Sequence, residues 1–461
     1  MGYQPPAHIL EVLQKIEYQE ALEQDDPRYV DTREARGSRQ TLNRLARKFG
    51  LDLGDGRFFP ATQRHVLFFG HTGSGKTTEL RHYAKHLGGP GRYLVVEVDI
   101  TNELDLHNLQ YADTLMAMAK ALLESLEKSG IELAPDALKK LEEWFCERVL
   151  NSEEAQEFSA KFESGAKVKG GLPFLIDLFS KFTVAFKTNA TYKDSMRRTI
   201  RNTFREFAQA FNGLLGQAEG ALEAANKAKR VLFVVDGTDK LRGEDTRAFF
   251  VQDAEQLLAI DAHVVYTAPL SLKYEGNLTS KLDADLVLPM VKLYERDGAR
   301  CDAGWKAMRA ILLKRAHHTL FAGEPEIERI VEHCGGHPRE MLRLLKLCCE
   351  FAEGERIDAA TVEAAIKQLA SEYRRFLEPD DYTLLAKIDR DPVHGGNDER
   401  TRKLLYDLAL LEYNDGSWRR SHPVVHGLEG YVRAVDEQDR AEKESKLERN
   451  QKLLDKFINQ R

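Results

Sequence analysis

One eight-residue motif constrains the fold of this chain more than any other feature. Residues 70–77 read Gly-His-Thr-Gly-Ser-Gly-Lys-Thr and match the pattern GxxxxGK[ST] in full. The motif follows the apolar run His65–Phe69, which predicts a buried strand, and it precedes a segment of helical character from Thr77 to Leu87. A glycine-rich loop between a strand and a helix is the setting in which this pattern binds phosphate.

Four further apolar runs predict the rest of a sheet. They span Tyr93–Ile100, Val231–Val235, His263–Thr267 and Leu286–Leu293. Because the first strand, the loop, the helix and the second strand form a βαβ unit, the strands are expected to run parallel. The sequence therefore predicts an α/β core with a parallel five-stranded sheet.

The remaining segments predict helical additions to this core. Residues 103–229 have helical periodicity and few turn signals, and they are far longer than a crossover between parallel strands needs. Two short strand-like runs flank Asn414, Asp415 and Gly416, as in the wing of a winged helix. The expected order is a helical lead-in (1–60), a P-loop core (61–299) with a helical insertion (103–229), a helical lid (300–370), a winged helix (371–435) and a charged C-terminal helix (436–461).

The phosphate-binding chemistry of the motif is divided among its residues. Backbone N–H groups of the glycine-rich loop surround the β-phosphate, Lys76 neutralises β- and γ-phosphate oxygens, and Thr77 offers its hydroxyl to Mg²⁺. ATP or ADP with Mg²⁺ is the expected ligand. The candidate nucleotide-binding residues are Gly70, His71, Thr72, Gly73, Ser74, Gly75, Lys76, Thr77 and Thr78.

A P-loop also needs a carboxylate on the metal side, and Asp236 follows the buried run Val231–Val235. Gly237 takes the place where many such ATPases carry the glutamate that polarises water. Asp239 is the candidate catalytic base, with helix N-capping as the alternative role, and Glu97 is a weaker substitute. An aspartate at a strand end also begins ordinary turns, which is the alternative for Asp236.

Two further polar positions are candidates for nucleotide sensing. Thr267 ends a predicted strand and is expected beside the attacking water, with a simple strand-end hydroxyl as the alternative. Pro338 and Arg339 begin a helix after two glycines. They either close over the nucleotide, with Pro338 at the base and Arg339 at a phosphate, or simply start that helix.

The segments GHTGSGKTT, VVDGTDKL, VVYTAP and GGHPRE together resemble the STAND class of AAA-like P-loop ATPases, which includes NACHT proteins and relatives of origin-recognition ATPases. The resemblance spans roughly residues 30–435. It implies an ASCE-type P-loop fold, with Asp236 at the magnesium position and Asp239 at the catalytic acidic position. Lys240 stands where NACHT members carry a further acid, which implies slow hydrolysis.

The same resemblance implies a GxP motif in a lid, at Gly336 and Pro338, and a His-Pro pair in the winged helix, at His422 and Pro423. The histidine of that pair contacts the ADP phosphate, and a buried structural histidine is the alternative for His422. Members of the class are nucleotide-driven switches that oligomerise or control an effector, often in bacterial defence against phage. Arg247 and Arg296 are the candidate arginines that would complete a neighbouring subunit's site.

Charge adds one local feature to the predicted insertion. The chain has 67 Lys and Arg against 74 Asp and Glu, which gives no overall attraction to nucleic acid or acidic lipid. Residues 161–205 nevertheless carry ten basic residues against three acidic ones. Three interpretations of this amphipathic segment remain open: a core helix, a docking helix for a partner protein, or a contact with a membrane surface (172–186) or nucleic acid. Its apolar stripe is Leu172, Leu175, Ile176, Phe179, Phe182 and Phe186, and the residues of a candidate hinge are Gly165, Gly170, Gly171 and Pro173.

The predicted winged helix has the wrong charge for binding DNA. Residues 378–435 carry eight basic and eleven acidic residues, whereas phosphate contacts require positive charge. A protein-contact role is therefore favoured, with Arg400, Arg402 and Lys403 as one small basic patch. The tail from Asp436 alternates in charge sign, as an exposed helix or short coiled coil does.

Three functions follow from these features. The first is an ATP-binding, slowly hydrolysing switch, the second a DNA-handling ATPase of the origin-binding or transposition-helper type, and the third a scaffold with a structural nucleotide. The five cysteines lack CxxC spacing, no signal peptide is visible, and no apolar run reaches the roughly 20 residues that cross a bilayer, so a cytoplasmic protein is expected.

Overall fold

The computed structural model describes residues 3–59, 63–133, 135–150, 153–160, 172–275, 278, 281–393 and 395–458. The chain divides into two compact units. The sheet unit consists of Gln40–Thr72 and Lys76–Val287, and the lid unit consists of Met1–Arg39, Gly73–Gly75 and Leu288–Arg461. The tip of the glycine-rich loop thus belongs to the lid unit.

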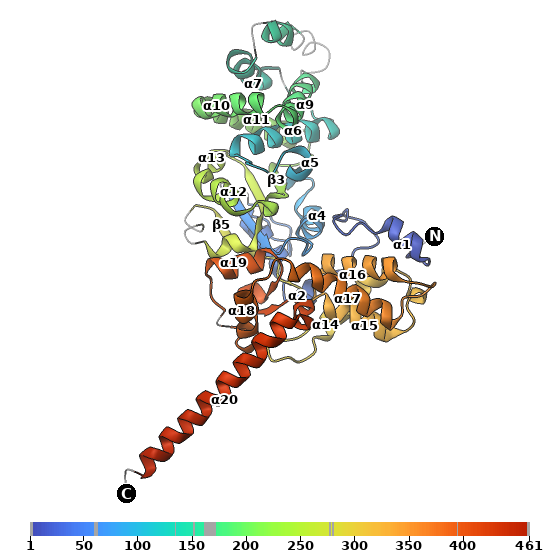
Figure 1. The fold of residues 1–461 in the computed structure, drawn as a ribbon. Coiled ribbons are helices and arrows are strands. Elements are labelled where there is room, and N and C mark those ends of the chain that lie inside the picture. The colour runs from blue at the N-terminus through green and yellow to red at the C-terminus, as the bar shows by residue number, and fades with distance from the viewer. Residues whose placement is uncertain are drawn as a thin grey trace. The chain divides into compact units, whose positions relative to one another are not determined.

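A parallel five-stranded sheet forms the centre of the sheet unit (Figure 1). Its strands are β1 (Arg64–Gly70), β2 (Tyr93–Asp99), β3 (Arg230–Asp236), β4 (His263–Pro269) and β5 (Asp283–Val287). They lie in the order β2-β3-β4-β1-β5, and every pair is parallel. The strand with the glycine-rich loop and the strand with Asp236 are therefore separated by β4, as in P-loop ATPases of the ASCE class, and the predicted α/β fold is confirmed.

The last strand differs from its prediction. The apolar run Leu286–Leu293 predicts a strand there, but β5 begins at Asp283 and ends at Val287. Pro289 has no N–H group to donate to a neighbouring strand. The rest of the run is buried in the lid unit, where Met290 packs against Leu411 and Trp418.

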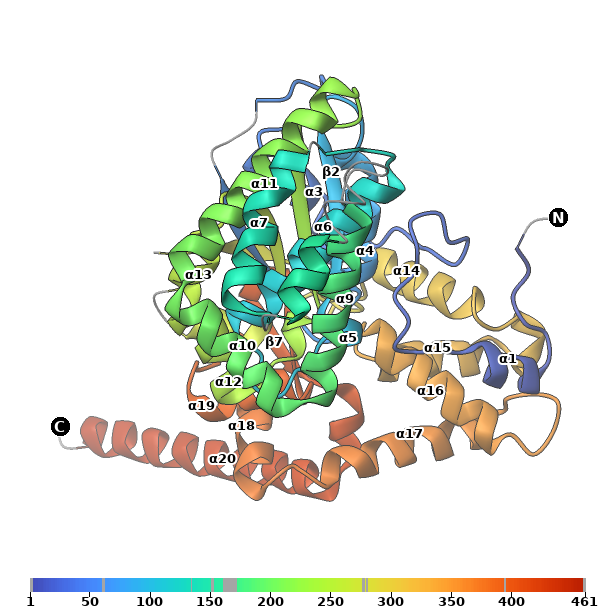
Figure 2. The same cartoon turned by 90° about the horizontal axis from the view of Figure 1, so that it is seen from above.

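Helices flank the sheet and form the insertion. These are α3 (Thr41–Lys48), α4 (Lys76–Leu87), α5 (Ile100–Glu103), α6 (Tyr111–Lys128), α7 (Pro135–Arg148), α9 (Leu172–Thr188), α10 (Ala190–Asn202), α11 (Phe204–Ala224), α12 (Gly243–Arg247) and α13 (Ala254–Leu258). Figures 1 and 2 show α6, α7, α9, α10 and α11 gathered into one bundle. A buried ion pair between Arg197 of α10 and Asp113 of α6 ties two of these helices together.

The apolar stripe of α9 faces the inside of this bundle. Leu175 and Phe179 are buried, and the ring of Phe145 from α7 lies 5.1 Å from the rings of both Phe179 and Phe182. Leu172 is also buried. The structure therefore supports the core-helix interpretation of this stripe over the membrane-surface interpretation. The side chain of Phe186 and the candidate hinge residues Gly165, Gly170 and Gly171 lie outside the described residues, and Pro173 is half-buried in the first turn of α9.

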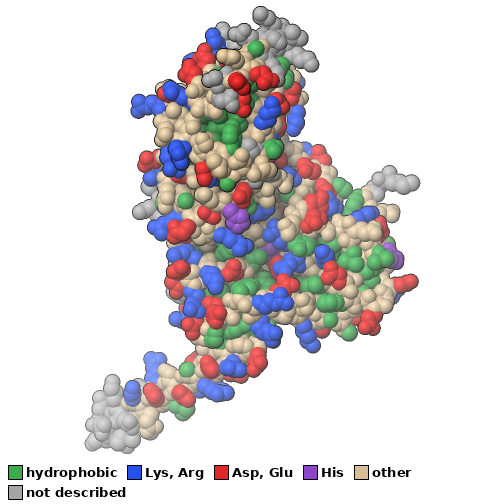
Figure 3. Space-filling view, turned by 45° about the horizontal axis from the view of Figure 1, so that its top comes forward, with side chains coloured by type: hydrophobic (Ala, Val, Ile, Leu, Met, Phe, Trp, Pro, Cys, Tyr) green, Lys and Arg blue, Asp and Glu red, His purple; other side chains and the backbone are tan. Residues whose placement is uncertain are grey.

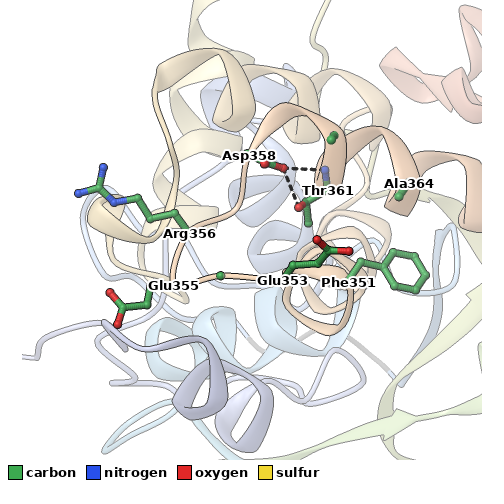
Figure 4. Close-up of a pocket in the computed structure, with 9 residues that line it drawn as sticks. Phe351, Glu353, Glu355, Arg356, Asp358, Thr361 and Ala364 are labelled. Atoms are coloured by element: carbon green, nitrogen blue, oxygen red, sulfur yellow. Dashed lines mark hydrogen bonds between the residues drawn. The ribbon is translucent and has the colours of Figure 1, made fainter.

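Helices also make up most of the lid unit. They are α1 (Ile9–Lys15), α2 (Arg33–Arg36), α14 (Asp302–Leu313), α15 (Glu324–His333), α16 (Pro338–Phe351) and α17 (Ala359–Arg374). A surface hollow of about 630 Å³ lies at the turn between α16 and α17 (Figure 4). The Asp358 carboxylate in this hollow accepts hydrogen bonds from the backbone N–H and hydroxyl of Thr361, so it caps α17. Glu353 and Glu355 also line the hollow, so together with Asp358 its acidic side chains outnumber the one basic side chain, Arg356, and the hollow is not suited to bind phosphate.

The C-terminal part has the elements of a winged helix. Helices α18 (Pro379–Arg390) and α19 (Glu399–Tyr406) precede the antiparallel strands β6 (Leu410–Tyr413) and β7 (Trp418–Ser421), which the predicted turn at 414–416 connects. Both strands are largely buried, because Leu411, Tyr413 and Trp418 pack on Met290.

A single helix, α20 (Glu429–Ile458), crosses residue 436, where the sequence suggested a separate C-terminal helix. Arg390 of α18 anchors it through Asp439 and Glu442. Figure 3 shows acidic and basic side chains interspersed along α20, and Leu447 is 69% exposed there. None of the helices described is long and apolar enough to pass through a bilayer.

Two buried histidines belong to strands of the sheet, His65 to β1 and His263 to β4. His65 faces the Tyr266 hydroxyl and the Ile260 carbonyl, and His263 packs against the ring edges of Phe49 and Tyr93. Burial lowers the pKa of both imidazoles to about 4. Each therefore stays neutral in the folded protein at a pH where the unfolded chain already binds a proton.

This burial predicts an acid-labile sheet unit. Because the pKa of each imidazole is lower in the folded state, stability is full above pH 6.5 and falls as the pH drops toward 4. Between pH 7.5 and 5.5 we expect a loss of about 1 kcal/mol per histidine in the free energy of unfolding. Urea melts at both values check this, and His263→Phe should remove about half of the pH dependence. An equal loss in wild type and variant would contradict the assignment to His263.

Candidate nucleotide-binding site

Lys76 lies in the first turn of α4 and is 4% exposed. Its ammonium donates to the carbonyls of Gly70 and His71, at 2.9 Å each, and forms an ion pair of 2.7 Å with Asp239. Asp239 is 6% exposed and follows β3 in a short 3-10 turn. The structure thus brings together two residues 163 positions apart that the sequence assigned to the same chemistry.

The predicted metal-binding pair is also in contact. The Thr77 hydroxyl donates to Asp236 Oδ2 at 2.8 Å. The other carboxylate oxygen, Oδ1, is buried and has no hydrogen-bond partner among the described residues. Burial and the nearby charge of Asp239 raise the pKa of Asp236. A divalent cation would satisfy the orphan oxygen and favour the charged carboxylate, so these residues fit Mg²⁺.

Mg²⁺ would need further ligands from the nucleotide. In the described part of the chain, no cluster of three His, Cys, Asp or Glu side chains is arranged to hold a metal. Mg²⁺ in phosphate-binding sites is ordinarily held by one or two protein groups together with substrate phosphates and waters. Thr77 and Asp236 would supply that protein share.

Thr267, near the end of β4, organises the turn that carries Asp239. Its hydroxyl oxygen accepts from the Gly237 N–H at 3.0 Å and donates to Asp239 Oδ1 at 3.4 Å. Its carbonyl accepts from the Thr238 hydroxyl. Thr267 is fully buried, and its hydroxyl contacts the candidate base Asp239. Its predicted place beside the attacking water stays a prediction.

Crowding explains the glycine that follows Asp236. Gly237 has φ +90°, and a Cβ there would lie 2.3 Å from Thr101 Oγ1, so a glutamate does not fit at this position. Lys240 donates to the same Thr101 hydroxyl at 3.1 Å. The predicted catalytic acid would therefore come from a later residue in the turn.

The remaining candidates of the sheet unit are in other positions. Glu97 pairs with Arg81 at 3.0 Å on an exposed surface, which makes it unsuited to be the base. Thr72 donates to the Asp239 carbonyl at 3.4 Å, and His71 is buried. Thr78 is half-buried in the first turn of α4. Arg247 is exposed at the end of α12.

In the lid unit, the tip of the loop lies against the start of α16. His337 is the N-cap of this helix, Pro338 is its first residue, and Arg339 follows. A Cβ on Gly73 would lie 2.8 Å from His337 Cε1 and 2.7 Å from Arg339 Nε, and Gly73 has φ +84°. Arg339 is therefore next to a residue of the phosphate-binding loop, and its contact with a phosphate stays a prediction.

His422 is fully buried in the lid unit. Its ring stacks on Tyr373 with centroids 5.0 Å apart, and its Nδ1 accepts from the Val424 N–H. Tyr373 in turn donates to Glu340. This is the environment of the structural histidine that the sequence left as the alternative. Arg296 is exposed, and its carbonyl accepts from Arg420.

Sequence reasoning missed one residue at the loop. Arg36 of α2 is 2% exposed and donates to the Ser74 carbonyl at 2.7 Å. It belongs to no phosphate-binding motif and lies 38 residues before Ser74. The only local signal is that an arginine stands four residues after Thr32, whose hydroxyl accepts from the Arg36 Nε–H.

No protein-family model and no curated protein matches the sequence. Among solved structures, the chain is similar to the Walker-type ATPase PABY2304 of Pyrococcus abyssi, with 14% identity over 89% of this chain and 98% of that one and a TM-score of 0.41. It is also similar to Cdc6p of Pyrobaculum aerophilum, with 13% identity over 91% and 98% and a TM-score of 0.37. A K64R mutant of RuvB from Thermotoga maritima has 15% identity over 48% and 82%, with a TM-score of 0.22. Identities and TM-scores this low carry no function from these proteins to this chain, whose own sheet order and loop motif define it as a P-loop protein of the ASCE class.

Proposed function

We propose that this chain is a Mg²⁺-dependent ATPase that acts as a nucleotide-controlled switch. The arrangement of Lys76, Thr77, Asp236 and Asp239 carries the proposal. A lysine for phosphate, a hydroxyl and an orphan carboxylate oxygen for the metal, and a second carboxylate for water all lie at the carboxyl end of β1 and β3. ATP and ADP are the proposed nucleotides.

The reaction assigns one role to each residue. Lys76 moves from Asp239 to the β- and γ-phosphate oxygens, while Thr77 and Asp236 hold Mg²⁺, which neutralises phosphate charge. Asp239, held by Thr267, accepts a proton from water as the water oxygen bonds to the γ-phosphorus. The bond from that phosphorus to the bridging oxygen of ADP breaks, and ADP and phosphate leave.

Slow turnover and switching follow from the same ion pair. Asp239 becomes available as a base only after Lys76 has moved to a phosphate, so nucleotide binding and base release are coupled. We propose that ADP and ATP favour different arrangements of the lid, with Arg339 beside Gly73 as a phosphate sensor and Pro338 as a base contact. A contact of His422 with ADP, self-assembly or effector control, and a role in anti-phage defence are predictions from the resemblance to STAND proteins.

The charges of the winged helix favour a protein switch over a DNA-handling ATPase. Arg419 is buried and paired with Glu412, and Arg400 contacts Asp380 and Asp381. These arginines are engaged within the domain, so they offer little to DNA phosphates. A salt-sensitive shift of duplex DNA in a gel would support the alternative.

Removing the lysine should strongly weaken nucleotide binding. Because Lys76 supplies charge-assisted hydrogen bonds to phosphate, Lys76→Ala should weaken ATP and ADP binding by roughly 10- to 100-fold or more. Calorimetric titration measures this, with Lys85→Ala on an exposed part of α4 as the matched control. Unchanged affinity in Lys76→Ala would contradict the assigned nucleotide site.

The two aspartates should separate metal binding from catalysis. The Asp239→Asn variant should still bind Mg²⁺ and ATP. It should hydrolyse ATP about 100-fold more slowly or worse, because the variant lacks the catalytic base. Asp236→Asn should lose the Mg²⁺ dependence of ATP affinity, because a neutral amide lacks the negative charge of the carboxylate and is a weaker ligand for Mg²⁺. Phosphate release and titrations with and without Mg²⁺ distinguish the two. Full turnover in Asp239→Asn would require a different base.

The switch should change its assembly state with nucleotide. We expect a larger particle with a non-hydrolysable ATP analogue than with ADP, measured by light scattering, and no shift in Lys76→Ala. The Lys85→Ala control should shift like the wild type. A wild-type protein that binds both nucleotides and stays a monomer of 52.4 kDa would contradict the assembling switch.

A further inference from the structure

We propose that Arg36 is a positioning residue that orients the phosphate-binding loop and couples it to residues 289–292, the segment that follows β5. The inference rests on the proposed function, because it assigns Arg36 to the nucleotide site of that function. All of the groups that carry it lie in the lid unit.

The first observation is the hydrogen-bonding pattern of the buried guanidinium. Arg36 donates to three neutral oxygens: Thr32 Oγ1 through Nε at 2.7 Å, the Pro289 carbonyl through Nη1, and the Ser74 carbonyl through Nη2 at 2.7 Å. A planar guanidinium with fixed donor directions holds three acceptors in one geometry, which a lysine ammonium on a flexible stem does not.

The second observation is the direction of the peptide that Arg36 holds. The Ser74 carbonyl and the Gly75 N–H belong to one trans peptide unit, in which the oxygen and the hydrogen point in opposite directions. With the oxygen fixed on Arg36, the Gly75 N–H points away from Arg36. This arginine therefore sets the direction of one N–H that the proposed function assigns to phosphate binding. A Cβ on Gly75 would lie 3.7 Å from Nη2, which shows how closely the guanidinium approaches the loop.

The third observation links the same arginine to the segment 289–292. Pro289 lies two residues after the end of β5. Three residues further on, the Lys292 N–H donates to the Ala35 carbonyl at 3.1 Å. The segment 289–292 is thus bound to α2 at two successive residues. A change in the Ser74 peptide on nucleotide binding would therefore alter the contact that Arg36 makes with this segment.

The guanidinium also adds a buried positive charge next to the loop. Arginine stays protonated at physiological pH, and a positive charge behind a phosphate-binding loop favours a polyanionic ligand. Geometry and charge make different predictions for Arg36→Lys, which keeps the charge and loses the three-oxygen geometry.

The test is a calorimetric titration of the full chain with ADP and Mg²⁺. Arg36→Gln should raise the Kd for ADP about tenfold, because it removes a charge-assisted hydrogen bond at the loop. Arg36→Lys should recover only part of that loss. The matched control is Arg39→Gln on the same segment, where an exposed arginine pairs with the exposed Glu34 and should leave the Kd unchanged. Damage to the fold alone would reduce the number of binding sites and leave the Kd of the remaining sites unchanged.

A milder variant keeps the test valid if Arg36→Gln does not fold. Thr32→Val removes the hydroxyl that orients Nε and keeps the shape, and it should raise the Kd by about two- to fivefold. Wild-type binding with an unchanged Kd in the folded Arg36 variant, or in Thr32→Val when the former does not fold, would overturn this inference alone. Absence of binding by the wild type would overturn the proposed function, and this inference with it.

Discussion

The buried ammonium of Lys76 is the charge around which the site is arranged. A cation removed from water must be compensated, and Asp239 together with two loop carbonyls provides that compensation. Thr267 fixes Asp239 in turn through its hydroxyl. The loop is therefore already held in shape by negative groups of the chain itself. On the proposed function, ATP competes with Asp239 for the lysine, so binding is an exchange of partners.

A steric constraint decides which acid fills that role. Thr101 stands so close to Gly237 that no side chain fits directly after Asp236, and Lys240 donates to the same threonine hydroxyl. The carboxylate in contact with Lys76 is Asp239. On the proposed function, Asp239 would be the partner of Lys76 in one state and the proton acceptor in the other. Separate residues would perform these two tasks independently. Combining them in one residue links turnover to nucleotide occupancy, which suits a switch better than a fast hydrolase.

The sequence revealed those parts of the structure that depend on local patterns. Apolar runs predict four of the strands. The spacing of glycine, lysine and threonine identifies the phosphate-binding loop, and the place of Asp236 directly after an apolar run identifies it as the candidate metal ligand. The end of β5 did not, because one apolar run continues from the sheet into a different core around Met290, and local hydrophobicity does not distinguish the two. The contacts of Lys76 with Asp239 and of Arg36 with Ser74 join distant positions, so only the folded chain reveals them.

Cooperativity between hydrogen bonds gives the Arg36 contact a physical meaning beyond support. A phosphate that accepts from the Gly75 N–H polarises the peptide it shares with Ser74, and the Ser74 carbonyl then becomes a stronger acceptor for Arg36. The same guanidinium also binds the Pro289 carbonyl through its other terminal nitrogen, so a tilt of the planar group toward one acceptor changes its geometry with the other. Nucleotide binding would thus change the relative strengths of the Arg36 hydrogen bonds to Ser74 and to Pro289 without a large movement. A difference of this kind between nucleotide states is what a ligand needs in order to shift a conformational equilibrium.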